Sequence, residues 1–313
     1  MRTIAAAALL ALGGAVHAAE PGYPTKPIRL LVGFTAGGSA DASARVIAAR
    51  IGQALGTTIV IENRSGAAGA VAGQIAARAA PDGYTLFWSS AGALTVSQIL
   101  EKNIGYDASA FAPIGRAFTF CNALVARPDF AASSVAQLVA LAKSRPGTID
   151  FGSQGVGSAG HLSGALLQNL TGITLTHVPY KGGNDILPAL LGGELSLAFA
   201  SSTTAKGMRS RVKVLAVTSA GRDPGLPDVP SMSEAGVKGY DAAFWFGLLA
   251  PARTPQPIVM RLGGLLRDTL ADADLTRPLL AQGLIAAPST PRGLAEQIRA
   301  DYAKWKRVIG GGK

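Results

Sequence analysis

Short apolar runs rich in β-branched residues alternate with amphipathic segments along most of the chain. Residues 28–34 form a mostly apolar run between Pro27 and Gly37, which is typical of a buried parallel strand. The following segment, 40–55, places Ala, Ile and Leu at helical spacing. This order of strand, turn and helix recurs, and it predicts an α/β fold with largely parallel sheets.

The expected strands are short apolar runs bounded by turn residues, and the expected helices carry apolar residues three to four positions apart. Strands are expected at 28–34, 58–61, 84–88, 112–118, 121–126, 149–152, 175–178, 195–200, 212–218 and 244–250. Helices are expected at 40–55, 70–79, 135–143, 158–170, 185–191, 257–271, 274–282 and 291–308. The last helices follow the final strand and must cover a sheet formed earlier. This predicts a discontinuous first domain, 19–122 and 248–313, and a second domain at 123–247.

The first 18 residues have the composition of a secretory signal peptide. Arg2 supplies the positive charge, residues 4–16 form an apolar run, and Ala18 ends a small-residue cleavage site. The run is short for a bilayer-spanning helix, and a buried N-terminal helix is the alternative interpretation. We expect cleavage after Ala18 and export of the mature chain to the periplasm.

Charge and cysteine content narrow the function classes only in part. The formal net charge is +10, but the basic residues are scattered and form no Lys/Arg block. We therefore expect no nucleic-acid partner, and an excess of positive charge also suits a protein that attracts anionic solutes. Cys121 is the only cysteine, which excludes an intrachain disulfide.

Two glycine-rich turns, 33–41 and 152–161, follow predicted strands and begin predicted helices. Backbone N–H groups and the helix dipole at such a turn form an anion site without Arg or Lys. Ser39 and Ser158 either donate a hydroxyl to a ligand or only cap their helices. Asp41 lies in the first helical turn, where stabilising the dipole is the simpler role, because a carboxylate repels an anionic ligand.

Other chemistry is weakly supported around the second turn. Residues 155–160 match G-x-G-x-x-G, but the next strand lacks the acidic residue that a dinucleotide site needs. Ser153 or Ser158 with His161 as base has no evident third member of a hydrolase triad. His177 lies in an apolar strand, where a hydrogen-bonded core residue is expected, and neither histidine has metal-ligand spacing. We expect no enzyme activity, no metal and no cofactor.

Ordered motifs run along nearly the whole mature chain. They are Tyr23-Pro24-x-Lys26-Pro27, Gly37-Gly38-x-x-Asp41, Glu62-Asn63-Arg64, Pro81-Asp82-Gly83-Tyr84, His177-Val178-Pro179-Tyr180-Lys181-Gly182, Leu226-Pro227-Asp228-Val229-Pro230 and Trp245-Phe246-Gly247-Leu248. The ordered set resembles the substrate-binding proteins of tripartite tricarboxylate transporters, often called the Bug family. The resemblance implies a two-domain periplasmic-binding-protein fold of the type 2 kind. Its ligand cleft would lie between domains that two crossover strands join.

The resemblance also implies that a ligand carboxylate sits on the two glycine-rich turns, partly through ordered water, and that hinge closure buries it. The candidate ligand-binding residues are Phe34, Thr35, Gly37, Gly38, Ser39, Asp41, Ser90, Ser153, Gly157, Ser158, His161, Ala200 and Ser201. Ala200 stands where the family commonly carries Asp, so we expect a ligand without a cationic group. Ser201 or Ser202 would meet its second acidic or hydroxylated end. Phe34 and Trp245 are interpreted either as stacking partners of an aromatic ligand or as core residues.

The function that the resemblance implies is capture of a small carboxylate in the periplasm. The ligand would be a di- or tricarboxylate, a hydroxy acid or an aromatic acid, and the partners would be small and large integral-membrane permease subunits. A monomer is expected. Two alternatives stay open: a periplasmic ligand sensor that docks on a signalling receptor, and a hydrolase on the same scaffold.

Overall fold

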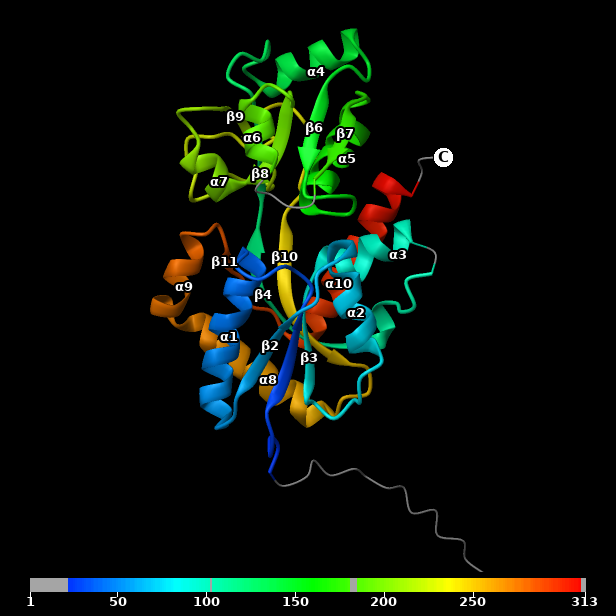
Figure 1. Cartoon of the computed structure of the whole chain (residues 1–313), viewed down its shortest axis with the longest axis vertical. Helices are drawn as coiled ribbons and strands as arrows, with labels where there is room; N and C mark the ends of the chain where they lie inside the picture. The colour runs from blue at the N-terminus through cyan, green and yellow to red at the C-terminus, as the bar shows by residue number, and fades with distance from the viewer. Residues whose placement is uncertain (1–21, 102, 181–184, 311–313) are drawn as a thin grey trace, which may run out of the picture.

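The computed structural model of the chain describes residues 22–101, 103–180 and 185–310. Two sheets lie at opposite ends of the long axis of the molecule, and helices cover both faces of each sheet (Figure 1). The predicted α/β class and two-domain organisation are confirmed. The predicted signal peptide, 1–18, lies outside the described residues.

The first domain is built on a six-stranded sheet with the order β11-β4-β10-β3-β1-β2. Strand β1 pairs in parallel with β2 and β3, whereas β10 runs antiparallel to β3 and β4. In chain order, the strands are β1 Ile28–Val32, β2 Ile59–Asn63, β3 Thr85–Ser90, β4 Phe111–Phe120, β10 Phe244–Pro251 and β11 Ile285–Ala286.

Side chains that alternate along β1 and β3 enter two separate cores. Leu30 and Trp88 pack on one face with Ile47 of α1, whereas Leu31 and Phe87 pack on the other face. The first face is covered by α1 Ser39–Leu55, α8 Gln256–Ala271 and α9 Ala273–Leu280. The second face is covered by α2 Ala70–Ala77, the π-helical segment η2 Gly92–Val96 with α3 Ser97–Leu100, and α10 Pro291–Ile309. The connections contain the short 3-10 segments η1 Ala67–Gly69 and η3 Ala108–Ala110.

The second domain is built on a five-stranded sheet with the order β7-β6-β8-β5-β9. Its strands are β5 Asn122–Ala126, β6 Asp150–Ser153, β7 Thr176–Pro179, β8 Leu197–Ser201 and β9 Lys213–Val217. One face is covered by α4 Val135–Ser144 and α5 Ala159–Thr171, and the other by α6 Ile186–Leu191 and α7 Ser202–Gly207. The sequence did not predict α7, which has only six residues.

The expectation of largely parallel sheets is wrong for the strands that join the domains. Strand β5 is antiparallel to β8 and β9, and β10 is antiparallel to β3 and β4. Both strands begin at the boundary between the domains and run away from it. The strands that lead into helices, such as β1 and β6, end at that boundary instead. A strand that starts at the boundary therefore runs antiparallel to neighbours that end there.

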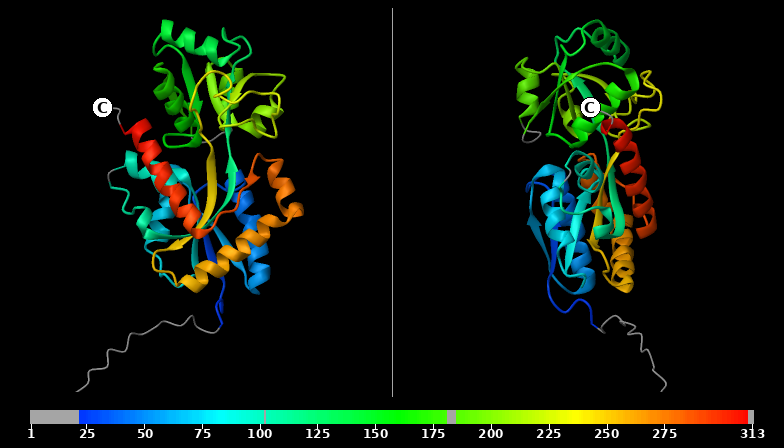
Figure 2. Two further views of the ribbon diagram at one scale, coloured as in Figure 1. Left: turned by 180° about the vertical axis from the view of Figure 1, so that it is seen from behind. Right: turned by 90° about the vertical axis from the view of Figure 1, so that its right-hand side faces the viewer.

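Two chain segments pass between the sheets, as predicted, close to residues 120–122 and 242–244. They meet at Thr218, whose backbone N–H donates to the Asn122 carbonyl at 2.8 Å and whose carbonyl accepts from Ala242 N–H at 2.7 Å. Helix α10 makes a further connection that the sequence did not reveal. The C-terminal end of α10 reaches the second domain (Figure 2). Its Trp305 ring stacks on Phe244 and joins the core of that domain. The exact domain limits, 19–122 with 248–313 and 123–247, stay a prediction.

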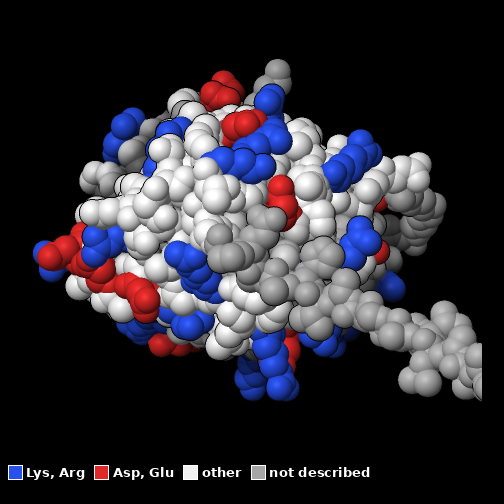
Figure 3. Space-filling view, turned by 90° about the horizontal axis from the view of Figure 1, so that it is seen from below, with Lys and Arg blue, Asp and Glu red and all other residues white. Residues whose placement is uncertain are grey.

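Charged side chains are mixed on the end of the first domain that faces away from the second. Figure 3 shows Lys and Arg in separate groups among Asp and Glu on this face. Between β1 and β2, Arg29 and Glu62 form an ion pair at 2.7 Å. Within the described ranges, no helix combines the length and the apolar composition needed to cross a bilayer.

Candidate functional site

The loops that follow the parallel strands of the two domains meet at the domain boundary. A Cβ atom added to Gly157, after β6, would lie 3.4 Å from Val96 and 3.6 Å from Ala68 of the first domain. A Cβ atom on Gly92, after β3, would lie 3.3 Å from the Gly157 carbonyl oxygen. Ligands of open α/β sheets bind at the carboxyl ends of the strands, so these facing edges form the candidate site.

Asp41 anchors the first glycine-rich turn from inside. Its side chain is buried, and its Oδ2 accepts hydrogen bonds from the Gly37 N–H at 3.0 Å and from Arg45 Nε at 2.9 Å. Its Oδ1 accepts a bond from Asn63 Nδ2 at 2.9 Å. Burial raises the pKa of Asp41, but the bonds from Arg45, Gly37 and Asn63 outweigh it and lower the pKa to about 2. The Asp41 carboxylate therefore stabilises the turn, and its oxygens are already occupied by these donors.

The surface of the first turn is formed by backbone and small side chains. Thr35, Gly37, Gly38 and Ser39 are all exposed. The N-cap residue of α1 is Gly38, which has no side chain to accept a hydrogen bond from the helix. The positive end of the α1 dipole therefore meets the site without a side-chain cap, which is the arrangement that binds anions.

Close packing with the neighbouring loop fixes the position of this turn. A Cβ atom at Gly33 would lie 2.6 Å from the Gly69 Cα, so only glycine fits between the loops after β1 and β2. Phe34 packs edge to face on Phe246, with ring centroids 5.7 Å apart. Trp245 is buried and donates from Nε1 to Asp301 at 2.7 Å. These contacts favour the core interpretation of both aromatic residues.

Uncharged side chains hold the second glycine-rich turn. Ser153 is fully buried, and its Oγ lies 2.6 Å from His177 Nε2. The same Oγ accepts a hydrogen bond from the Gly155 N–H at 3.2 Å and lies 3.3 Å from the hydroxyl of Ser158. Ser158 caps α5 by accepting a bond from the His161 N–H at 3.3 Å. Ser153 thus supports the turn from below.

The two histidines lie side by side under this turn, with ring centroids 4.5 Å apart. Burial lowers the pKa of His161, and burial together with the nearby His161 lowers the pKa of His177 to about 4. Both rings are neutral at pH 7. The Gly157 N–H donates to His161 Nδ1 at 3.2 Å, so we assign the proton of the neutral ring to Nε2. That N–H is a donor without charge.

The remaining candidates lie at the ends of β3 and β8. Ser90 and Ala200 are buried, at 7% and 5% exposure. Ser201 caps α7: its Oγ accepts a hydrogen bond from the Thr204 N–H at 3.2 Å and lies 2.7 Å from the Thr204 hydroxyl. The capping role uses part of the hydrogen-bonding capacity that the sequence assigned to the ligand.

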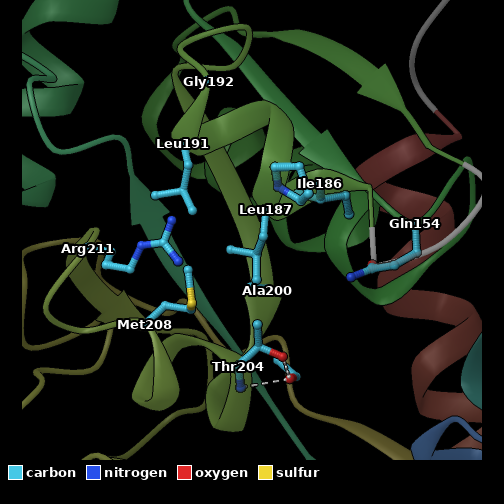
Figure 4. A pocket seen from close by; sticks show the side chains of 11 residues that line it. Gln154, Ile186, Leu187, Leu191, Gly192, Ala200, Thr204, Met208 and Arg211 are labelled. Atoms are coloured by element: carbon cyan, nitrogen blue, oxygen red, sulfur yellow. Dashed lines mark hydrogen bonds between the residues drawn. The ribbon is translucent and has the colours of Figure 1, made fainter.

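A pocket of about 760 Å³ adjoins the end of β8 (Figure 4). Of the candidates, Ala200 and Ser201 line it; the rest of the lining, which includes α6, Met208 and Arg211, was not predicted. The sequence did not predict a role at the site for Asn63, and it predicted His177 only as a hydrogen-bonded core residue. Asn63 ends β2 beside the β1 turn, and that position on a carboxyl edge is the signal that could have found it.

In the described part of the chain, no group of three or more His, Cys, Asp or Glu side chains is placed to hold a metal ion. The short distance between Ser153 and His177 has the form of a nucleophile and base. However, Ser153 is fully buried, and the His177 ring is flanked by the rings of Phe151 and His161. The pair therefore holds the turn rather than presenting a nucleophile.

Known proteins resemble the chain over nearly all of its length. A family profile described as "Tripartite tricarboxylate transporter family receptor" matches residues 43–311. BugT of Bordetella pertussis is 33% identical over 295 residues, covering 92% of this chain and 89% of BugT. The structure of R. palustris Rpa4515 with adipate superposes with a TM-score of 0.83 at 34% identity, covering 92% of this chain and 97% of that one. MatC of Rhodopseudomonas palustris with bound malate gives a TM-score of 0.80 at 30% identity, covering 92% and 100%.

Proposed function

The chain belongs to the tripartite tricarboxylate transporter receptor family, and from this premise we propose that it captures a small carboxylate between its two domains. The observation that carries the proposal is that both glycine-rich turns pack against the loop 67–69 at the facing carboxyl edges, Gly33 beside Gly69 and Gly157 beside Ala68. Each turn opens a helix of more than ten residues, α1 and α5, at the domain boundary. Helix N-termini of this kind favour a bound anion.

The site we propose recognises the carboxylate mainly through groups without net charge. The uncapped N-terminus of α1 offers backbone N–H groups, and neutral His161 offers its Nε2–H. The negative charge of Asp41 is balanced by its ion pair with Arg45, so it opposes an incoming anion only weakly. Hydrogen bonds from such prearranged donors to an ionised acceptor are stronger than bonds between neutral groups.

We propose dicarboxylates and hydroxy acids as the ligand class. Ala200 brings no carboxylate to the end of β8, so the site has no partner there for a ligand amine. The related structures hold adipate and malate, which have two carboxylates and no amine. A simple amino acid is therefore expected to bind more weakly than an acid of similar size.

The cellular role follows from the family and from the predicted signal peptide. We place the mature chain in the periplasm, where it would deliver its ligand to small and large permease subunits. The sensor alternative has no structural observation of its own in its favour. The hydrolase alternative has two candidate nucleophiles: Ser153 is fully buried, and the Ser158 hydroxyl caps α5 by accepting a hydrogen bond from the His161 backbone N–H. A monomer stays a prediction.

The test is a thermal-shift panel on the folded, ligand-free chain from Ala19. Succinate, malate, adipate, citrate, benzoate and aspartate would each be added at rising concentration. A ligand present at 100 times its dissociation constant adds about 2.7 kcal/mol to the free energy of unfolding, which raises the midpoint by several degrees. The proposal predicts that a di- or hydroxycarboxylate gives the largest shift. A flat response to every acid, or the largest shift with aspartate, contradicts it.

A further inference from the structure

A pocket in the second domain begins where the candidate site ends. Gln154 and Ala200, at the carboxyl ends of β6 and β8, line the pocket (Figure 4), and so does Ser201. These are the same strand ends that face the first domain. We infer that this pocket is a subsite for the far end of an elongated dicarboxylate, with Arg211 as the group that binds the second carboxylate. The inference rests on the proposed function and deepens it.

The middle of the pocket is apolar. Leu187 and Leu191 stand one helical turn apart on α6, and Figure 4 shows both side chains on the pocket side, facing Met208. Both leucines are only partly buried, although they pack against the hydrophobic core between α6 and the sheet of the second domain. A polar ligand chain would gain nothing from this wall, whereas an aliphatic or aromatic spacer would bury apolar surface against it.

Arg211 supplies the charge at the side away from Gln154. Its guanidinium lies beside Met208 and Leu191 at the pocket (Figure 4). Within residues 22–101, 103–180 and 185–310, Arg211 makes none of the ion pairs found. Its neighbour Arg209, two residues earlier, pairs with both oxygens of Asp228. The guanidinium of Arg211 is thus the one of the two that is open to a carboxylate, which it can bind through two parallel hydrogen bonds.

The size of the pocket fits an extended molecule. Its volume of about 760 Å³ lies within the range of small-molecule sites. A short diacid held by its first carboxylate on those turns would leave the pocket unused. The ligand that uses both parts has two carboxylates separated by an apolar spacer, either an alkyl chain or an aromatic ring.

The experiment measures dissociation constants by calorimetry for succinate, adipate, suberate and the monocarboxylate octanoate. It uses the wild-type chain, Arg211→Gln, and the matched control Arg209→Gln. Arg211→Gln should weaken the longer diacids about tenfold or more, since a charged hydrogen-bonding partner is lost. The same variant should change succinate and octanoate less than twofold, and Arg209→Gln should leave all four acids within twofold.

Two outcomes separate the inference from the function. If the acids bind but Arg211→Gln weakens succinate as much as suberate, or weakens neither, the subsite is wrong and the carboxylate-binding function stands. If the folded wild-type chain binds none of the acids, both are overturned. A salt titration gives a further check. The affinity for suberate should fall more steeply with ionic strength in the wild type than in Arg211→Gln, and equal slopes in the two proteins contradict a role for Arg211.

Discussion

The two glycine-rich turns occupy equivalent places in their domains, but different chemistry holds each one. A buried carboxylate, Asp41, fixes the turn after β1 and is balanced by Arg45 and Asn63. The turn after β6 rests on an uncharged network in which Ser153 bonds to His177. The backbone geometry is similar because both turns join a parallel strand to a helix. Their supports therefore respond differently to mutation and to acid.

The two turns also differ in how their charge changes with pH, which affects the binding of an anion. The first turn contains a full negative charge that is already paired, and because the pKa of Asp41 is lowered to about 2, this charge does not change near neutral pH. The second turn contains two neutral imidazoles that can accept protons. A bound carboxylate would favour protonation of the nearer ring. The second turn is thus the side on which ligand binding and pH are expected to be coupled.

The largest expected effect comes from removing the charged support. Asp41→Ala should lower the free energy of unfolding by about 2–4 kcal/mol, because the Gly37 N–H and the Asn63 amide lose a buried acceptor. The fall in the pKa of Asp41 from 3.8 to about 2 alone corresponds to about 2 kcal/mol. Urea unfolding measures the loss.

The matched control for this experiment is Asp274→Ala. Asp274 is exposed, lies in the first turn of α9 and pairs with Arg277 at 3.1 Å. A surface pair of this kind contributes within about 0.5 kcal/mol. If Asp274→Ala and Asp41→Ala cost the same, the first turn does not depend on its buried carboxylate.

A smaller effect should separate the turns by pH. Below pH 6.5 the unfolded chain protonates His177, whereas the folded chain does so only near pH 4. The free energy of unfolding should therefore decrease as the pH falls from 6.5 to 4, with a slope from this residue below about 1.4 kcal/mol per pH unit. Asp41 loses its contribution only as the pH falls from 3.8 to about 2.

The variant that tests this assignment is His177→Gln, whose amide can still bond to Ser153 but does not titrate. Urea unfolding at pH 7.5, 6 and 5 should give a flatter pH dependence for the variant than for the wild type. Both proteins should behave alike above pH 6.5, where the imidazole is neutral in either state. An unchanged slope in His177→Gln would assign the acid sensitivity to other groups.

The sequence predicted the fold well because most elements carry their own pattern. Helix α1 buries Ala44, Ile47, Ala48 and Ile51, the residues whose spacing indicated a helix. The π-helical segment 92–96 was not predicted, because its residues are all buried and show no periodic face. Strand direction failed at β5 and β10, since an apolar run of this kind does not tell which way it enters a sheet.

The positions of the two turns were also predictable, because glycines between a strand and a helix mark an anion site. The roles of their side chains were not. Asp41 and Asn63 are 22 residues apart, and Ser153 and His177 are 24 apart, so each pair forms only when parallel strands come side by side. The pocket at Arg211 was missed for the same reason, since α6, α7 and the end of β8 meet only in the folded domain.

The smallest expected effect distinguishes the two serines that begin the helices. Ser158→Ala should lower the free energy of unfolding by about 1 kcal/mol, because Ser158 caps α5. Ser39 follows the N-cap Gly38 and is exposed, so Ser39→Ala should change stability by less than about 0.5 kcal/mol. Urea unfolding compares the two, and calorimetry with the best acid of the panel measures their affinities.

The two serine variants separate the support of a turn from the recognition of the ligand. If the α1 terminus holds the carboxylate, Ser39→Ala should weaken binding several-fold while the fold stays intact. Ser158→Ala should weaken binding together with stability, since its hydroxyl orders the turn that carries Gly157. A Ser39→Ala variant that binds as tightly as the wild type would leave the backbone N–H groups of α1 as the donors on that side. Equal stability losses for the two variants would contradict the assignment that Ser158 caps its helix whereas Ser39 does not.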